Sequence, residues 1–214
     1  MNFNQFLKAR SKISNLPLPA EASQFKMSPP FRAALAKKQQ DKIKFAKQSA
    51  VLALFYPDQE EEETNLVLIL RKSYKGVHSA QVGFPGGKVE ETDVSLQHTA
   101  LRETEEEVGM PMQDVKVIKA LTQMYIPPSN FYVHPFIGYT DYTPNFVKEE
   151  SEVEDIIEVS LQQFLDDRNV VIERVSTSYN REVEVPAFKL NNHVVWGATA
   201  MMLSEIKDLL KQAL

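Results

Sequence analysis

The sequence contains no cysteine, no long apolar run and no excess of basic residues. Without cysteine the chain cannot form disulfides, thiolate nucleophiles or zinc sites with thiolate ligands. Its longest apolar run, residues 50–56, is far below the roughly 20 residues that a membrane-spanning helix needs. Residues 1–10 include no apolar stretch of the kind found in secretory signals. We therefore expect a cytoplasmic protein that does not enter a membrane.

The charge balance excludes one further class of partner. The chain has 24 Lys and Arg residues against 29 Asp and Glu residues, a formal net charge of −5 at pH 7. General nucleic-acid binding usually comes with a basic balance, so we expect no nucleic-acid partner. The length of 214 residues suits one domain with an extension and is sufficient to bury a core. The sequence does not decide between a monomer and a homodimer.

The most informative segment is residues 84–110. It begins with Phe-Pro-Gly-Gly, continues through an acidic turn and enters a helical pattern rich in glutamate. Asp93 is the expected N-cap of this helix, and Gly109 is the residue expected just past its C-terminus. Three of its acids are spaced i, i+3 and i+4 and therefore share one helix face: Glu103, Glu106 and Glu107.

This acidic face is unfavourable for the helix by itself. Like charges at these spacings each cost a few tenths of a kcal/mol, and the C-terminal end of a helix repels anions further. Carboxylate oxygens are suitable ligands for a hard cation such as Mg²⁺ or Mn²⁺. A solvated acidic face is the alternative, but the preceding glycine bend and the capped boundaries favour a metal site.

The segment resembles the signature of the Nudix hydrolases, Gly-x5-Glu-x7-Arg-Glu-U-x-Glu-Glu-x-Gly-U, in which U is a bulky apolar residue. The second half of the signature matches residue by residue at Arg102, Glu103, Glu106, Glu107, Gly109 and Met110. The first half departs from it. After Gly87 the acidic position is Asp93 rather than a glutamate, and one extra residue separates it from Arg102. Thr104 also stands where an aliphatic residue is usual.

The lengthened turn is similar to that of one branch of the family, the coenzyme A pyrophosphatases, which carry Phe-Pro-Gly-Gly before it. Their upstream pattern is partly met: Arg71 and residues 84–87 match, whereas Lys72, Gly76 and Ala80 differ from it. The Trp-Gly-Ala-Thr-Ala segment at residues 196–200 is also similar to this branch. Together the matches span about residues 51–203.

The apolar periodicity predicts an α/β fold with a mixed sheet between helices. The resemblance implies the same Nudix-like α/β/α sandwich, with an N-terminal helical extension at 1–46 and the hydrolase domain at 47–214. We expect residues 16–30 to be a connector, residues 58–63 a hairpin tip, residues 126–130 a turn, and Pro135 a break in its strand. Helices are predicted at 4–13, 31–45, 161–166 and 196–213, and strands at 48–56, 66–72, 115–125, 131–140, 152–159, 170–177 and 182–190.

The chemistry follows from the charge of a diphosphate linkage, which repels nucleophiles. Divalent cations neutralise that charge and lower the pKa of a bound water. The resemblance implies that the metal ligands are Glu103, Glu106 and Glu107, of which Glu103 and Glu106 also count as catalytic. Glu152 is the candidate for a further ligand or the general base, although an ordinary loop acid stays open. Arg102 is expected to orient a carboxylate.

Substrate contacts are expected around the glycine bend. Glycines at positions 86 and 87 let the backbone turn tightly and approach phosphate oxygens. Two cations at the end of the preceding strand are candidates for holding a terminal phosphate of the substrate, such as the 3′-phosphate of coenzyme A. The predicted substrate-binding residues are Arg71, Lys72, His78, Phe84, Gly86 and Gly87.

Three functions compete. The first is metal-dependent hydrolysis of coenzyme A or its thioesters to 4′-phosphopantetheine, or its acylated form, and adenosine 3′,5′-bisphosphate. The second is the same chemistry on ADP-ribose, a nucleoside diphosphate sugar, a dinucleotide or an oxidised nucleotide. The third is a catalytically silent Nudix-fold module that binds a nucleotide or a protein. The intact glutamate set weighs against the third, and in the first two the partner is a small molecule.

Overall fold

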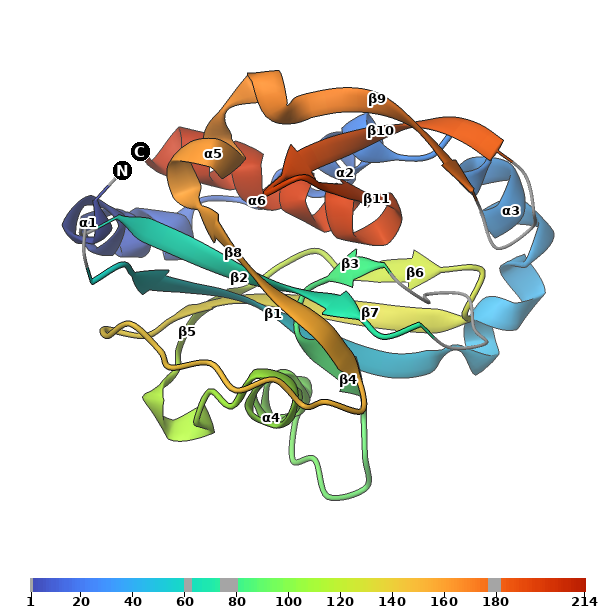
Figure 1. Cartoon of the computed structure of the whole chain (residues 1–214). Helices are drawn as coiled ribbons and strands as arrows, with labels where there is room; N and C mark the ends of the chain where they lie inside the picture. Colours follow the sequence, from blue (N-terminus) through green and yellow to red (C-terminus); the bar gives the residue numbers. More distant parts are fainter. Residues whose placement is uncertain (1, 60–62, 74–80, 177–181) are drawn as a thin grey trace.

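A mixed β-sheet lies at the centre of the molecule, with helices on both of its faces (Figure 1). The computed structural model describes residues 2–59, 63–73, 81–176 and 182–214. Within these ranges the main sheet has eight strands. They are β1 (Lys47–Pro57), β2 (Thr64–Arg71), β3 (Val82–Gly83), β4 (Gly86–Lys88), β5 (Lys116–Ala120), β6 (Met124–Ile126), β7 (Phe131–Tyr139) and β8 (Val153–Ser160).

The strands follow the order β3-β2-β1-β7-β5, with β4 paired to β1, β6 to β7 and β8 to β2. The sheet is mixed because β1 and β7 are parallel, whereas β1 is antiparallel to β2 and β4. A smaller sheet has the order β11-β10-β9, formed by β9 (Val170–Ser176), β10 (Glu182–Leu190) and β11 (His193–Trp196). The predicted α/β class with a mixed sheet is therefore confirmed.

Alternating residues of β1 separate the two layers of the core. Leu52 and Leu54 are fully buried in the layer that contains Ala100 and Val108 of α4 (Leu96–Val108). Ala53 and Phe55 face the other layer, which α1 (Phe3–Asn15) and α6 (Gly197–Ala213) cover. In Figure 1, α4 lies below the sheet and α1 and α6 lie above it. The result is the three-layer sandwich that the resemblance implied.

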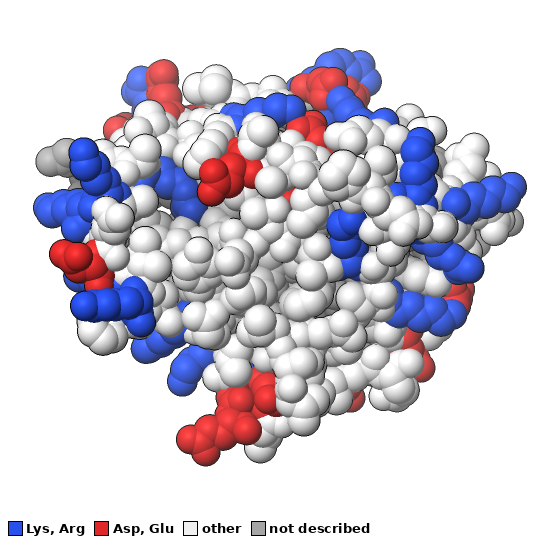
Figure 2. Space-filling view, turned by 180° about the vertical axis from the view of Figure 1, so that it is seen from behind, with Lys and Arg blue, Asp and Glu red and all other residues white. Residues whose placement is uncertain are grey.

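The remaining helical segments are short. They are α2 (Ala20–Gln24), α3 (Arg32–Lys38), α5 (Leu161–Leu165) and the 3₁₀ turns η1 (Phe25–Met27), η2 (Gln40–Phe45), η3 (Met112–Asp114) and η4 (Asp167–Asn169). Exposed lysines of α3 and η2 lie at positions 37, 38, 42 and 44. Figure 2 shows the opposite face of the molecule, where uncharged side chains fill the middle and basic side chains lie along both lateral edges. No helix in the described ranges is long and apolar enough to cross a membrane.

The N-terminal extension packs onto the last helix. Phe6 and Ile13 of α1 are fully buried in the main core. Glu205 of α6 is also fully buried, and its carboxylate accepts hydrogen bonds from Gln24 Nε2 at 2.9 Å and from Thr122 Oγ1 at 2.6 Å. These contacts join α2 to α6 and to the loop after β5. The domain boundary between residues 46 and 47 stays a prediction.

Residues 16–30 are more ordered than the predicted connector, since they contain α2 and η1. A five-residue helix has almost no stability of its own. Its packing on α6 and its bonds to Glu205 supply the stability, and neither is visible in the local sequence. The predicted helix at 31–45 likewise divides into α3 and η2, with the change at Gln39.

Two predictions for the strands around Pro135 were wrong. Strand β7 continues through Pro135, and the predicted strand at 115–125 divides into β5 and β6. The Pro135 carbonyl accepts a hydrogen bond from Leu121 N, in the gap between β5 and β6. In a strand the backbone nitrogen and carbonyl of one residue point to the same neighbouring strand. The nitrogen of Pro135 therefore points to the gap between β5 and β6, where its missing N–H removes no hydrogen bond between strands.

Candidate functional site

Helix α4 carries the predicted glutamates and is capped at both ends. Its N-cap is Ser95, whose Oγ accepts a hydrogen bond from His98 N at 3.1 Å, so the prediction of Asp93 at this position was wrong. Gly109 closes the helix with φ of +74°, as predicted. Thr104, which stands in place of an aliphatic residue, is buried and donates to the Ala100 carbonyl at 2.7 Å. Its hydroxyl is thereby satisfied within the helix.

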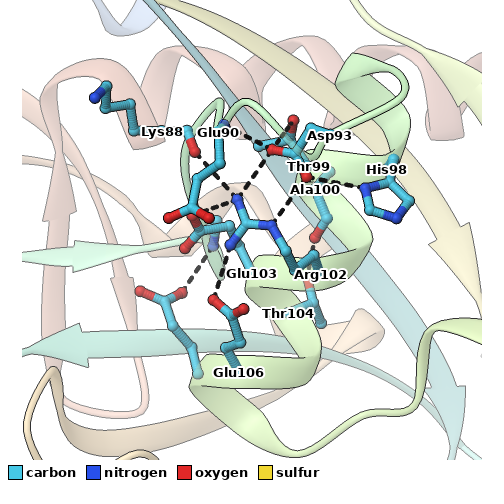
Figure 3. A network of polar contacts seen from close by, with 12 residues as sticks. Lys88, Glu90, Asp93, His98, Thr99, Ala100, Arg102, Glu103, Thr104 and Glu106 are labelled. Atoms are coloured by element: carbon cyan, nitrogen blue, oxygen red, sulfur yellow. Dashed lines mark hydrogen bonds and ion pairs between the residues drawn. The ribbon is translucent and has the colours of Figure 1, made fainter.

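Asp93 instead anchors Arg102. The two carboxylate oxygens of Asp93 accept hydrogen bonds from Arg102 Nε at 2.9 Å and Arg102 Nη2 at 3.0 Å, and its side chain has no contact with solvent (Figure 3). His98 Nδ1 and Thr99 Oγ1 lie 2.9 Å from the same carboxylate. The Arg102 guanidinium holds the pKa of Asp93 well below its usual range. Asp93 therefore has a structural role, as the partner of Arg102 nine residues further along the chain.

Asp93 is expected to make stability depend on pH. Because its pKa is lowered in the fold, its carboxylate stabilises the folded state above an unfolded pKa of about 3.9, and this contribution is lost as pH falls below that value. We expect Asp93→Asn to lower the free energy of unfolding by roughly 2–4 kcal/mol near neutral pH. The deficit should shrink from about pH 4 downwards.

Denaturant unfolding of both proteins at several pH values measures this difference. The control is Glu91→Gln, which replaces an exposed acid in the same turn and should unfold like the parent. A deficit of Asp93→Asn that stays constant from neutral pH to pH values below 3 would contradict the assignment.

Arg102 also binds two of the predicted glutamates (Figure 3). Its Nη2 donates to Glu103 Oε1 at 3.0 Å, and its Nη1 donates to Glu106 Oε2 at 2.8 Å. Glu103 is largely buried, with 14% of its side chain exposed, whereas the Glu106 side chain is 56% exposed. One guanidinium, fixed from behind by Asp93, thus sets the positions of both carboxylates.

The glycine bend fits closely around these acids. A Cβ atom on Gly87 would lie 2.3 Å from the Glu103 Oε2 atom, so the carboxylate occupies the space that any larger residue would fill. Gly86 has φ of +148° and donates its N–H to Glu107 Oε2 at 2.8 Å. The bend and the helix are therefore joined by direct contacts with two of the three glutamates.

Glu107 is the most buried of the set, with 2% of its side chain exposed. Besides Gly86 N, it accepts a hydrogen bond from Arg71 Nη1 at 3.2 Å. Burial raises the pKa of Glu107 to about 7, against the opposing effects of Arg71 and the Gly86 N–H. Burial also raises the pKa of Glu103. The hydrogen bonds and the arginines of the protein therefore do not fully offset the cost of burying the charged forms of Glu103 and Glu107.

Arg71 links the helix to the loop before β8. Its Nη2 lies 4.0 Å from Glu152 Oε2, so its guanidinium lies between Glu107 and Glu152. Lys72 donates instead to the Glu150 carbonyl, and a substrate-binding role for Lys72 stays a prediction. His78 lies outside the described residues. Both predicted cations that the structure describes thus have protein partners.

A cavity of about 470 Å³ opens beside this cluster. Six predicted site residues line it: Arg71, Phe84, Gly86, Gly87, Glu103 and Glu152. Sequence reasoning missed two further walls, which are formed by the end of the extension (Pro29, Phe31, Arg32 and Leu35) and by residues 126–129 at the end of β6 and in the following turn. The segment 196–199 also lines it, and its likeness to the coenzyme A branch was the one local signal for this wall.

The acids do not form a ready-made metal site. Among the described residues, no three His, Cys, Asp or Glu side chains converge as ligands. Arg102 holds Glu106, and Arg71 with Gly86 N holds Glu107, so an ion that takes these carboxylates as ligands must compete with those contacts. The donor set itself consists only of carboxylate oxygens, which suit Mg²⁺ or Mn²⁺.

The chain has clear similarity to known proteins. Residues 46–178 match the family described as the NUDIX domain. A protein named "Uncharacterized Nudix hydrolase NudL" from Yersinia pestis (strain Pestoides F) is 32% identical over 145 residues, which cover 67% of this chain and 71% of the relative.

Two solved structures share the fold. The Nudix hydrolase RenU from M. smegmatis has a TM-score of 0.53 and 13% identity, covering 78% of this chain and 87% of that chain. The MutT protein from Methanosarcina mazei Go1 has a TM-score of 0.50 and 17% identity, covering 78% and 95%. At these identities the two structures support the fold alone.

Proposed function

Because this chain belongs to the Nudix family and is a Nudix hydrolase, we propose that it hydrolyses the diphosphate linkage of coenzyme A or its thioesters. The products are adenosine 3′,5′-bisphosphate and 4′-phosphopantetheine or its acylated form. One observation carries the proposal. The two segments that resemble the coenzyme A branch, around residues 84–87 and 196–199, line one cavity although they are far apart in the sequence.

The residues fit a divalent cation at this site. Burial raises the pKa of Glu103 and Glu107, so a cation would supply the compensation that the protein lacks. Glu103, Glu106 and Glu107 would hold it, with Glu152 as a further ligand or as the base. When bound, Mg²⁺ or Mn²⁺ neutralises diphosphate charge and lowers the pKa of a coordinated water.

The chain's own residues supply positioning and proton transfer. Gly86 and Gly87 let the backbone approach the diphosphate, and Arg102 fixes the carboxylates of Glu103 and Glu106. In the proposed step the oxygen of a water molecule bonds to one phosphorus, and the bond from that phosphorus to the bridging oxygen breaks. The other phosphate leaves with the bridging oxygen, and Glu152 accepts the proton of the water.

Glu152→Gln should lower kcat far more than it raises KM, because the variant keeps the size of the side chain and loses its proton acceptor. The expected loss in kcat is about 100-fold or more. Steady-state kinetics at saturating metal measure both constants. Glu154→Gln, two residues further along in β8 and also exposed, is the control. Unchanged kinetics for Glu152→Gln together with crippled Glu149 or Glu150 variants would mean that the wrong acid of this loop is assigned.

A substrate panel tests the function itself. Coenzyme A, acetyl-coenzyme A, ADP-ribose, a nucleoside diphosphate sugar and a diadenosine polyphosphate are offered with Mg²⁺ or Mn²⁺, and the products are identified by mass. We expect the bisphosphate and a phosphopantetheine fragment as the main products. Better hydrolysis of ADP-ribose or a dinucleotide would keep the chemistry and replace the substrate. Nucleotide binding without any hydrolysis would favour a silent module.

A further inference from the structure

Arg32 is a cation in the cavity without an acidic partner among the described residues. It is the first residue of α3, in the N-terminal extension and outside the matched family region. Its Nη2 donates to the Tyr125 carbonyl at 2.5 Å, and the guanidinium is half-buried. Burial lowers the pKa of Arg32, with no carboxylate opposing that effect.

A half-buried cation without an acidic partner loses part of its hydration at a cost to the folded protein. A guanidinium has five N–H donors and carries a full charge, whereas Tyr125 supplies one neutral acceptor. The cavity wall around it is apolar, with Phe31, Leu35 and Phe131 among the lining residues. An apolar wall strengthens attraction to an anion, since it excludes the water that would screen the charge. The position therefore favours an anionic ligand.

The register of the sheet separates Arg32 from the glutamates. From the glycine bend the neighbouring strands follow in the order β4, β1, β7 and β6. The pairs in register are Lys88 with Ser49, Ser49 with Val133, and Val133 with Met124. Three steps between neighbouring strands therefore separate the glycine bend from the strand that anchors Arg32. At about 4.8 Å per step, this is roughly 14 Å.

We propose that Arg32 binds a second anionic group of the substrate, a phosphate monoester that is distinct from the diphosphate at the glycine bend. The substrate class is then a nucleoside diphosphate derivative with an additional phosphate on the nucleoside. This inference rests on the proposed hydrolase function and extends it, because it makes the N-terminal extension the element that selects the substrate.

The arrangement fits this class. Arg32, Gly86 and Gly87 line the same cavity, so one ligand can contact Arg32 and the glycine bend together. A 5′-diphosphate and a 3′-phosphate on one ribose place two separate anionic groups on one small molecule.

Other cations of the molecule are less suited to this role. Arg71 contacts Glu107 and Lys72 contacts the Glu150 carbonyl, so both are engaged within the protein. The lysines at 37, 38, 42 and 44 are exposed and do not line the cavity, so water screens their charge. Lys88 also lines the cavity, but it is exposed and directly follows the glycine bend, where it would contact the diphosphate. Arg32 combines a place in the cavity away from the bend with an uncompensated charge.

The direct test is binding without catalysis. Calorimetry in the presence of chelator compares adenosine 3′,5′-bisphosphate with AMP on the full chain. The parent should bind the bisphosphate about tenfold to a hundredfold more tightly. Arg32→Ala should remove most of that preference, and Arg32→Lys should keep part of it. Lys38→Ala, a loss of one exposed cation from the same helix, is the matched control and should keep the full preference.

Kinetics separate this inference from the proposed function. With coenzyme A and 3′-dephospho-coenzyme A, Arg32→Ala should raise KM for coenzyme A alone and leave kcat nearly unchanged. If neither compound is hydrolysed, coenzyme A is not the substrate. The calorimetry still tests whether Arg32 binds the additional phosphate. Equal affinity of the parent for bisphosphate and AMP, or an undiminished preference in Arg32→Ala, overturns the inference even if coenzyme A is cleaved. Thermal unfolding shows whether Arg32→Ala is folded. If it is not, the preference for the bisphosphate over AMP is compared between Arg32→Lys and the parent.

Discussion

Replacing Glu107 by glutamine is expected to reduce turnover by about two orders of magnitude or more, or ~3 kcal/mol of transition-state stabilisation. Glutamine keeps the size and the helix propensity of the side chain, so the variant should fold. It lacks the charge that the proposed cation requires. It also removes the anion that Arg71 Nη1 contacts at 3.2 Å. Turnover at saturating Mg²⁺, measured beside an unfolding curve, checks both parts of this expectation.

Glu105 provides the matched control for this variant. It lies on the same helix, is exposed, and accepts a hydrogen bond from Met112 N at 2.9 Å, away from the other glutamates. Glu105→Gln should therefore keep nearly full activity. Equal activity of Glu107→Gln and the parent would refute the assignment, and so would parental turnover in excess chelator.

Gly86→Ala is expected to be the most damaging single change to the fold of the site. A Cβ atom at position 86 would lie 2.4 Å from the Ala50 carbonyl oxygen and 2.6 Å from Val51 Cα, and both are backbone atoms of the central strand. The φ of +148° is also unfavourable for any residue with a side chain. We expect a loss of roughly 3 kcal/mol or more in the free energy of unfolding, together with loss of activity.

Gly83, three residues earlier, is the control for the effect of crowding at Gly86. A Cβ atom there would meet only Thr199 Oγ1, at 4.0 Å, which is an ordinary van der Waals distance. Gly83→Ala should change the free energy of unfolding by less than about 1 kcal/mol. Chemical denaturation of the two variants makes the comparison, and similar curves for both would show that crowding at Gly86 is unimportant.

Local sequence was sufficient for the features that depend on local geometry. Gly109 was identified because a helix end requires a residue that tolerates positive φ, and glycine does so at little cost. The N-cap was assigned to the wrong residue because Asp93 and Ser95 are both good capping types. What decides between them is Arg102, which takes the Asp93 carboxylate and leaves Ser95 to cap the helix.

The cavity walls depend on contacts between distant segments. The residues at 29–35 and at 126–129 have no shared pattern in the sequence, and only the folding of the extension over β6 and β7 brings them together. The hydrophobic periodicity of each element predicts which face is buried, but not which neighbour covers it. This is why the glutamates were predicted and Arg32 was not.

The turn before α4 is one residue longer than the family signature, and its acid is one methylene group shorter than glutamate. Both differences meet at one contact, where the carboxylate reaches Arg102 with bonds of 2.9 and 3.0 Å. The length of the turn and the length of the acidic side chain both act on the separation between the backbone of the turn and the guanidinium. The insertion and the substitution are therefore expected to depend on each other. Relatives with the longer turn should carry aspartate here, those with the shorter turn should carry glutamate, and intermediates with only one of the two changes should be rare.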